Sequence, residues 1–271
     1  MTDAEAAPLF LEMRLLAAQA VAREAGALAR RRFLDSSFEV GFKGPQDYMT
    51  DVDSETEQLI AARLQSVFPG DGFIGEETES RVGADGGSLW VVDPIDGTAN
   101  FVRGVPHFCV SIAYVASGKV EIGVVYDPMR DELFAARRGG GARLNGAPIH
   151  ASKTDALANS TIEVGWNART GAAKYIGLLS RVTLTGAAPR RTGSGALGVA
   201  YVVAGRIDGF VEHHINAWDC LAAILLVEEA GGYVSDFLSG DGLIKGAPII
   251  ACAPGVKEAL ISAAAIEGLA L

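Results

Sequence analysis

Two aspartates three residues apart, Asp93 and Asp96, offer the most informative chemistry in this sequence. They end an apolar run within the segment Trp90-Val-Val-Asp-Pro-Ile-Asp-Gly-Thr98. Pro94 restricts its own φ and favours an extended Asp93. Gly97 then permits a sharp bend, and Thr98 can cap a following helix. Carboxylates, a carbonyl and free N–H groups should therefore gather at one strand end, which predicts a site for magnesium and phosphate. The alternative is an ordinary surface turn, which the same residue types also favour.

Three more acids stand where the chain should change direction. Glu76 follows a glycine after a short apolar stretch, Asp219 follows a tryptophan at the start of an apolar run, and Asp53 lies near a predicted helix start. Carboxylates in a first helical turn are also explained by the helix dipole, without any function. For Asp219 alone both explanations stay open. The dipole explanation is adopted for three acids of the same predicted helix, Asp51, Glu55 and Glu57.

The elements that must position these acids follow from hydrophobic periodicity. Helical spacing predicts helices at 9–33, 50–68, 172–179, 196–203 and 217–230, and a last one from 254. β-rich stretches predict strands at 38–42, 73–74, 89–92, 110–115, 120–126, 132–136, 162–164 and 208–212, and near 233 and 249. Short turns join the strands between 110 and 136, so these should form an antiparallel meander. The layout is mixed α/β with two sheets, divided near residue 150 into halves 1–149 and 150–271.

Composition limits the classes of function. The chain has 271 residues, of which 49% are hydrophobic, and a formal net charge of −10. An acidic chain argues against sequence-independent nucleic-acid binding, which needs a basic surface. The sequence shows no signal peptide and no apolar stretch of the ~18 residues that span a bilayer, so no membrane association is expected. Three cysteines in apolar runs predict buried thiols and a cytoplasmic protein: Cys109, Cys220 and Cys252.

Four segments together resemble the inositol monophosphatase family of magnesium-dependent, lithium-sensitive phosphatases. They are Asp47–Asp53, Gly75-Glu76-Glu77, Trp90–Thr98 with Asn100-Phe101, and Trp218-Asp219 followed by Glu229-Ala-Gly-Gly232. Each segment alone is weak support, but they occur in the family's order and at similar spacing. The resemblance implies a layered α-β-α-β-α sandwich with an antiparallel sheet in the N-terminal half, a second mixed sheet in the C-terminal half, and assembly as a homodimer.

The resemblance also implies a set of metal ligands for two to three Mg²⁺ ions. Glu76, Asp93 and the carbonyl of Ile95 would hold one ion. Asp93, Asp96 and Asp219 would hold a second, so that the two ions clamp the entering and leaving oxygens. A third, weaker ion would lie near Glu76.

The same resemblance assigns roles in catalysis and phosphate binding. Thr98 and Asp53 would form a hydrogen-bonded pair that orients and deprotonates a metal-activated water. The N–H groups of Gly97 and Thr98 would bind the phosphate. Lys43 resembles a family lysine near the phosphate, but an ordinary surface side chain is an equal alternative.

The segment Gly193-Ser194-Gly195-Ala-Leu-Gly198 has two competing explanations. It matches the GxGxxG pattern, with Glu212 about twenty residues on, but no apolar strand precedes it, as a dinucleotide site requires. The resemblance instead implies that Gly193, Ser194 and Gly195 form a substrate loop together with Arg190. Glu212 would bind sugar or inositol hydroxyls, and Gly198 could serve close helix packing. The neighbouring histidines, His213 and His214, could also face the pocket.

These expectations favour an Mg²⁺-dependent phosphomonoesterase whose partner is a small-molecule phosphate monoester, with inositol 1-phosphate the first choice. Related families use the same chemistry on fructose 1,6-bisphosphate, histidinol phosphate or 3′-phosphonucleotides. A regulatory binding protein that keeps the fold is the alternative of a different class, since some bacterial relatives act on RNA polymerase complexes. The complete set of implied site residues favours catalysis.

Overall fold

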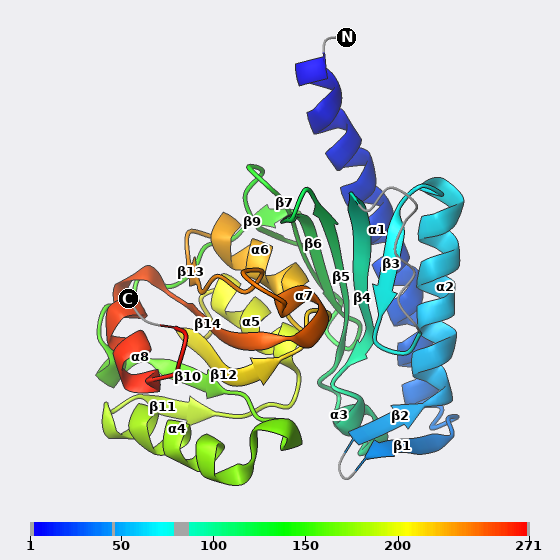
Figure 1. Cartoon of the computed structure of the whole chain (residues 1–271). Coiled ribbons are helices and arrows are strands. Elements are labelled where there is room, and N and C mark those ends of the chain that lie inside the picture. The colour runs from blue at the N-terminus through cyan, green and yellow to red at the C-terminus, as the bar shows by residue number, and fades with distance from the viewer. Residues whose placement is uncertain (1–2, 45–46, 79–86, 270–271) are drawn as a thin grey trace.

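The structure, a computed structural model, describes residues 3–44, 47–78 and 87–269, and gives only the backbone of residues 3–8. Two main sheets and the helices around them form most of the molecule (Figure 1). A separate two-stranded sheet precedes them, made of β1 (Val40–Gly44) and β2 (Asp47–Thr50). The glycine-rich stretch before residue 87 lies mostly outside the described residues.

The larger sheet has seven strands in the order β3-β4-β5-β6-β7-β8-β9. Its strands are β3 (Gly72–Gly75), β4 (Ser88–Asp96), β5 (Cys109–Ala116), β6 (Lys119–Asp127), β7 (Glu132–Arg137), β8 (Arg143–Leu144) and β9 (Ala147–Pro148). Only β3 and β4 pair in parallel, so the predicted antiparallel meander is confirmed.

Strand β4 runs further than the predicted strand at 89–92. Its pairing with β5 is irregular between Asp93 and Asp96, and it resumes where Asp96 pairs with Cys109. Pro94 explains the interruption, because proline has no N–H group to give to the ladder. Both aspartates therefore belong to an irregular strand end, and only Gly97, with φ of 103°, starts the turn.

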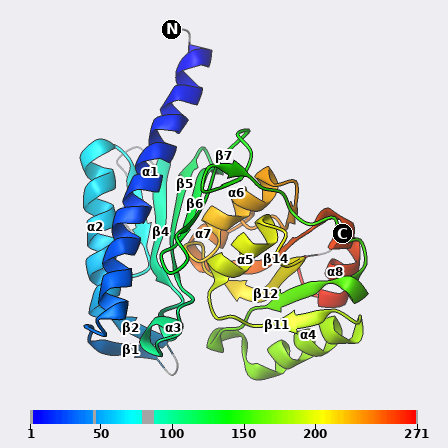
Figure 2. The same cartoon turned by 180° about the vertical axis from the view of Figure 1, so that it is seen from behind.

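Helices cover both faces of the larger sheet (Figures 1 and 2). On one face lie α1 (Asp3–Leu34) and α2 (Asp51–Val67), and on the other α5 (Gly195–Val203) and α6 (Leu221–Glu229). Small side chains let α1 approach the sheet closely, because four alanines at helical spacing are fully buried: Ala18, Ala22, Ala25 and Ala29. The short helix α3 (Thr98–Val102) follows β4 and contacts β2.

The second sheet has five strands in the order β11-β10-β12-β14-β13, and it is mixed. Its strands are β10 (Thr161–Val164), β11 (Ala188–Arg190), β12 (Gly209–Ile215), β13 (Tyr233–Val234) and β14 (Ala247–Cys252). Two helices, α4 (Ala172–Leu184) and α8 (Lys257–Ala264), pack on its outer side. Short helices complete the chain: η1 (Leu157–Asn159), η2 (Ala168–Thr170), α7 (Gly242–Lys245) and η3 (Pro254–Val256).

Five layers result, in the order α-β-α-β-α, as the family resemblance implies (Figure 1). Helices α5 and α6 form the central layer, and their cluster of buried side chains includes residues from both halves, such as Val91 and Leu225. Because this cluster crosses residue 150, it does not separate the two predicted halves, and the division at residue 150 stays a prediction. No helix among the described residues is long and apolar enough to cross a membrane.

One predicted helix begins later than expected. The sequence predicts helix from 217, but α6 starts at Leu221, and its N-terminal neighbour Cys220 has a non-helical φ of −139°. The carboxylate of Asp219 holds this turn by accepting the backbone N–H of Asn216 at 3.3 Å and its side-chain amide at 3.2 Å. Asp219 thus lies in a turn before the helix and not in its first turn.

Candidate active site

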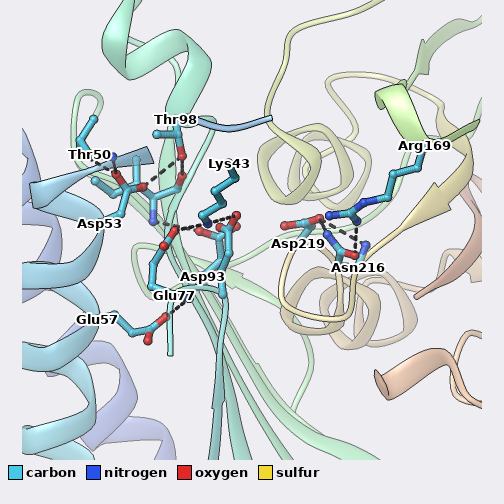
Figure 3. Close-up of polar contacts among 12 residues, drawn as sticks. Lys43, Thr50, Asp53, Glu57, Glu77, Asp93, Thr98, Arg169, Asn216 and Asp219 are labelled. Atoms are coloured by element: carbon cyan, nitrogen blue, oxygen red, sulfur yellow. Dashed lines mark hydrogen bonds and ion pairs between the residues drawn. The ribbon is translucent and has the colours of Figure 1, made fainter. Parts of the chain in front are cut away.

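Three of the predicted metal ligands meet in space. Carboxylate oxygens of Glu76, Asp93 and Asp219 all lie within 4.8 Å of one another. Glu76 directly follows β3, and the parallel pairing of Gly75 with Val92 places it beside Asp93 on β4. Asp219 approaches from the C-terminal half, on the turn before α6 (Figure 3). The larger sheet and the central helix layer together create the cluster.

The acids of this cluster repel one another in a buried setting. Burial and the nearby charge of Asp219 raise the pKa of Glu76 to about 8. Burial and the charge of Glu76 raise the pKa of Asp93 well above its usual range, and burial also raises that of Asp219. A divalent cation would offset this repulsion, and carboxylate oxygens are the donors that hard cations prefer. The donor set therefore fits a divalent metal.

Asp96 points to the N-terminus of α5. Its carboxylate accepts the N–H groups of Gly195 at 3.2 Å and Ala196 at 2.7 Å, and the hydroxyl of Ser194 also donates to it. Burial and the charge of Asp219 nevertheless raise the pKa of Asp96 to about 7, so Asp96 lies within the field of the cluster.

The glycine-rich segment after β11 has two roles to compare with the predictions. A side chain at Gly198 would meet the Phe210 ring at 2.9 Å, which confirms close packing as that glycine's role. The Gly193–Gly195 loop lines the cavity, and its contact with substrate stays a prediction.

The predicted pair of Asp53 and Thr98 is brought together. Thr98 Oγ1 lies 3.1 Å from Asp53 Oδ1 and 2.9 Å from the carbonyl oxygen of Ile95, so its hydroxyl can donate to either. The other oxygen of Asp53 accepts the N–H group of Thr50 at 2.7 Å. Burial raises the pKa of Asp53 to about 6, which suits a proton acceptor working near neutral pH.

Glu57 has a role that the sequence analysis missed. The helix-dipole explanation is wrong for it, because Glu57 is fully buried and its Oε2 accepts the N–H group of Glu77 at 2.9 Å. A Cβ at Gly75 would lie 2.2 Å from that same oxygen, so only glycine fits there. Glu57 follows Asp53 by four residues and therefore lies on the same face of α2. One helix face thus supports both the Asp53–Thr98 pair and the loop that carries Glu76. The four-residue spacing between Asp53 and Glu57 was the sequence signal that could have identified Glu57.

Lys43 lies at the acidic edge of the cluster. Its Nζ is 3.2 Å from Glu76 Oε1 and 2.6 Å from Glu77 Oε1 (Figure 3). Lys43 is nevertheless exposed and is not among the described residues that line the cavity, so its place near the phosphate stays a prediction. By contrast, Asp51 forms an ion pair with Arg32 and accepts the N–H of Glu39, which fits the structural role adopted for it.

A cavity of about 530 Å³ lies over these residues, and Glu212 forms part of its wall. Glu212 accepts a hydrogen bond from the side-chain amide of Asn167 at 3.0 Å, and burial followed by the charge of Asp219 raises its pKa to about 8. Several other residues of the wall match no sequence motif and could not be predicted: Glu163, Trp166, Asn167, Arg169, Arg191 and Asn216.

Two expectations about this wall are wrong. Neither His213 nor His214 is among the described residues that line the cavity. The charges of Lys174 and Arg181 on α4 act on His213, so it lies on the outer side of the sheet, while the His214 ring lies against Gly246. The second expectation placed Arg190 in the substrate loop. Arg190, at the end of β11, does not line the cavity, whereas its neighbour Arg191 does.

Replacing Glu57 by alanine is expected to weaken divalent-cation binding by about 10- to 100-fold, the usual cost of losing a residue that orients a metal ligand. The change leaves the N–H group of Glu77 without its acceptor and frees the loop that carries Glu76. Calorimetric titration with Mn²⁺ measures the effect. Glu57→Gln is the matched control, because its amide oxygen can still accept the bond, and equal losses in both variants would contradict the proposed role.

Comparisons with known proteins agree with this geometry. A sequence model of the inositol monophosphatase family matches residues 11–268. Nus factor SuhB from Escherichia coli strain K12 is 41% identical over 244 residues, which is 89% of this chain and 91% of that protein. Inositol-1-monophosphatase from Rhizobium meliloti strain 1021 is 39% identical over 244 residues, 89% of this chain and 92% of that protein.

A solved structure shows the same fold. The extragenic suppressor protein suhB from Bartonella henselae superposes with a TM-score of 0.86 at 37% identity, covering 97% of this chain and 99% of that one. Nearly the whole length therefore matches in sequence and in structure. The chain belongs to the inositol monophosphatase family.

Proposed function

We propose that this protein is an Mg²⁺-dependent phosphomonoesterase that hydrolyses inositol 1-phosphate or a related polyol or sugar phosphate. The observation that carries the proposal is the meeting of Glu76, Asp93 and Asp219 within 4.8 Å, next to the hydrogen-bonded Asp53–Thr98 pair. Family membership and the Rhizobium meliloti relative named inositol-1-monophosphatase support the choice of substrate.

Two to three Mg²⁺ ions would be held by the carboxylates of the site. Glu76, Asp93 and the carbonyl of Ile95 would hold one, and Asp93, Asp96 and Asp219 a second. Bound cations would supply Lewis acidity, which stabilises charge on the phosphate and makes a water molecule more acidic.

The chain's own residues would move the proton and hold the substrate. Thr98 would accept a proton from the attacking water and pass its own to Asp53, and the hydrogen bond between them supports this route. The pKa of Asp53, about 6, leaves it mostly ionised at neutral pH. The N–H groups of Gly97 and Thr98, at the turn after β4, would bind the phosphate. Glu212, with a pKa of about 8, would be protonated at neutral pH and could donate a hydrogen bond to a substrate hydroxyl.

A covalent route through a thiol finds no support. Cys109 is the cysteine nearest the cluster, with Sγ 3.7 Å from Asp96 Oδ2. Burial and the charge of Asp96 raise the pKa of its thiol well above the usual value, so the nucleophilic thiolate is disfavoured.

The proposal is tested by measuring phosphate release with Mg²⁺, and with EDTA, on a panel of esters. The panel contains inositol 1-phosphate, fructose 1,6-bisphosphate, histidinol phosphate, adenosine 3′,5′-bisphosphate and NADP⁺. We expect metal-dependent release, with a polyol or sugar phosphate hydrolysed most efficiently. Absence of release from every ester by folded, Mg²⁺-bound protein would contradict the proposal.

A regulatory binding role is the second candidate, and the relatives named Nus factor SuhB favour it. The two roles are compatible, because binding to a partner needs a surface and catalysis needs the cavity. Phosphatase activity remains the first choice because every residue implied for it is present, including Asp53, Thr98 and Glu212. Activity of the pure protein, without any partner, separates the two candidates.

Three further properties belong to this proposal. We expect inhibition by Li⁺ and assembly as a homodimer, since both are implied by the family resemblance. A cytoplasmic location is supported by the three cysteines, which are buried free thiols in the structure.

A further inference from the structure

The wall of the cavity carries two arginines. Arg169 on η2 and Arg191 after β11 are the cationic residues among the described ones that line the cavity. Both are exposed. Within residues 9–44, 47–78 and 87–269, no salt bridge involves either of them. Two positive charges therefore face an otherwise acidic cavity without a carboxylate partner of their own.

Neighbouring residues contact both arginines. The backbone N–H of Arg169 donates to Asn167 Oδ1 at 2.9 Å, and its Nη1 donates to Asn216 Oδ1 at 2.6 Å (Figure 3). The guanidinium carbon of Arg191 lies 5.6 Å from the centre of the Trp166 ring. A cation–π contact of this kind leaves the N–H groups of the guanidinium free to bind a ligand.

The charges of these arginines already act on the cavity. Burial raises the pKa of Glu212, and the charge of Arg191 opposes that rise. Arg169 is linked to the carboxylate cluster through Asn216, whose side-chain amide donates to Asp219 Oδ2 at 3.2 Å. Both cations therefore lie near groups that line the cavity, and Arg169 lies on the opposite side of the carboxylate cluster from the Asp53–Thr98 pair (Figure 3).

The size of the cavity leaves room for such a ligand. At about 530 Å³ it falls in the range of sites that enclose whole small molecules, roughly 300–1,000 Å³. A phosphate at the carboxylate cluster would occupy only part of this volume. The wall of the same cavity also includes Glu212, Trp166 and the two arginines.

We propose that Arg169 and Arg191 form a second anion subsite, which selects sugar or polyol esters that carry a second phosphate away from the ester being cleaved. This assignment rests on the proposed function, because it concerns the uncleaved part of the same substrate. The forked guanidinium matches the oxygens of a phosphate, and a charge-assisted pair is stronger than a neutral hydrogen bond.

The test compares fructose 1,6-bisphosphate with fructose 1-phosphate, which share the C1 ester and differ only in the second phosphate. We expect kcat/KM for release of the C1 phosphate to be at least about tenfold higher for the bisphosphate, mainly through a lower KM. Arg191→Gln should reduce this ratio to about threefold or less. Arg169→Gln should also lower it.

Arg190→Gln is the matched control, because it removes the same charge from the adjacent exposed residue that does not line the cavity. The ratio should stay at its wild-type value in this variant. Equal rates on the two esters in the wild type would overturn the subsite, and so would an equal fall of the ratio in Arg190→Gln and Arg191→Gln.

Inositol 1-phosphate separates this inference from the proposed function. If the wild type hydrolyses inositol 1-phosphate with Mg²⁺ but gains nothing from a second phosphate, only the subsite is rejected. If it hydrolyses none of the three esters, the proposed function is rejected and the subsite with it.

Discussion

Replacing Asp93 by asparagine is expected to lower phosphate-ester hydrolysis by about a thousandfold or more at saturating Mg²⁺. Asp93 is the central acid of the cluster, and it would contact both metal ions. Losing its charge removes several kcal/mol of stabilisation from the transition state, and about 1.4 kcal/mol corresponds to tenfold in rate. Steady-state phosphate release by the purified variant measures the effect.

The stability of the same variant shows whether the loss is chemical or structural. Asp93 is buried among like charges, so removing its charge should leave the metal-free protein as stable as the wild type or more stable. The asparagine oxygen can still accept the N–H group of Ile95, which lies 2.9 Å from Asp93 Oδ1. Wild-type activity, or a large fall in the melting temperature without metal, would contradict the assigned role.

The metal-free protein is expected to lose stability as the pH rises from about 6.5 to 8.5. The pKa of Glu76 is raised to about 8 and that of Asp96 to about 7, chiefly by burial. Between the usual and the raised pKa, the folded state binds more protons than the unfolded state, so the free energy of unfolding falls as the pH rises. A tenfold difference in proton affinity between the two states corresponds to about 1.4 kcal/mol, so the free energy of unfolding should fall by several kcal/mol.

Mg²⁺ should reduce this loss strongly, because a bound cation stabilises the ionised carboxylates. Glu212 also has a raised pKa and is not a proposed ligand, so a smaller slope should remain. Below pH 6.5 the histidines act in the opposite direction, since burial lowers the pKa of His107, His213 and His214. Thermal melts in EDTA and in Mg²⁺ across this range check the expectation. A flat or rising stability in EDTA above pH 6.5 would contradict it.

Much of the fold and part of the site follow from local sequence. The meander could be predicted because its strands are joined by short turns, and α2 because its apolar period is regular. The position of Glu76 beside Asp93 depends on one parallel pairing between neighbouring strands. Asp219 is different, because it reaches the cluster from the other half of the chain. Its position in the sequence left a structural explanation equally open, and only the family resemblance made it a predicted ligand.

The remaining residues could not be assigned from sequence because their roles depend on contacts between distant elements. Glu57 is buried only because Gly75, on another element, leaves space for its carboxylate. The contact of Asp96 with α5 joins residues about a hundred positions apart. Whether Arg190 or Arg191 faces the cavity depends on where the edge strand β11 ends, and strand ends are the least predictable part of a sheet.

The most direct test of the account is diffraction from crystals soaked in Mn²⁺, measured at the absorption edge of manganese. We expect anomalous peaks at the carboxylate cluster, with oxygens of Glu76, Asp93 and Asp219 as ligands at about 2.0–2.3 Å. A second ion should also draw in Asp96. Absence of any peak at this cluster, in protein that hydrolyses phosphate esters in the same Mn²⁺ buffer, would contradict the assignment of the active site.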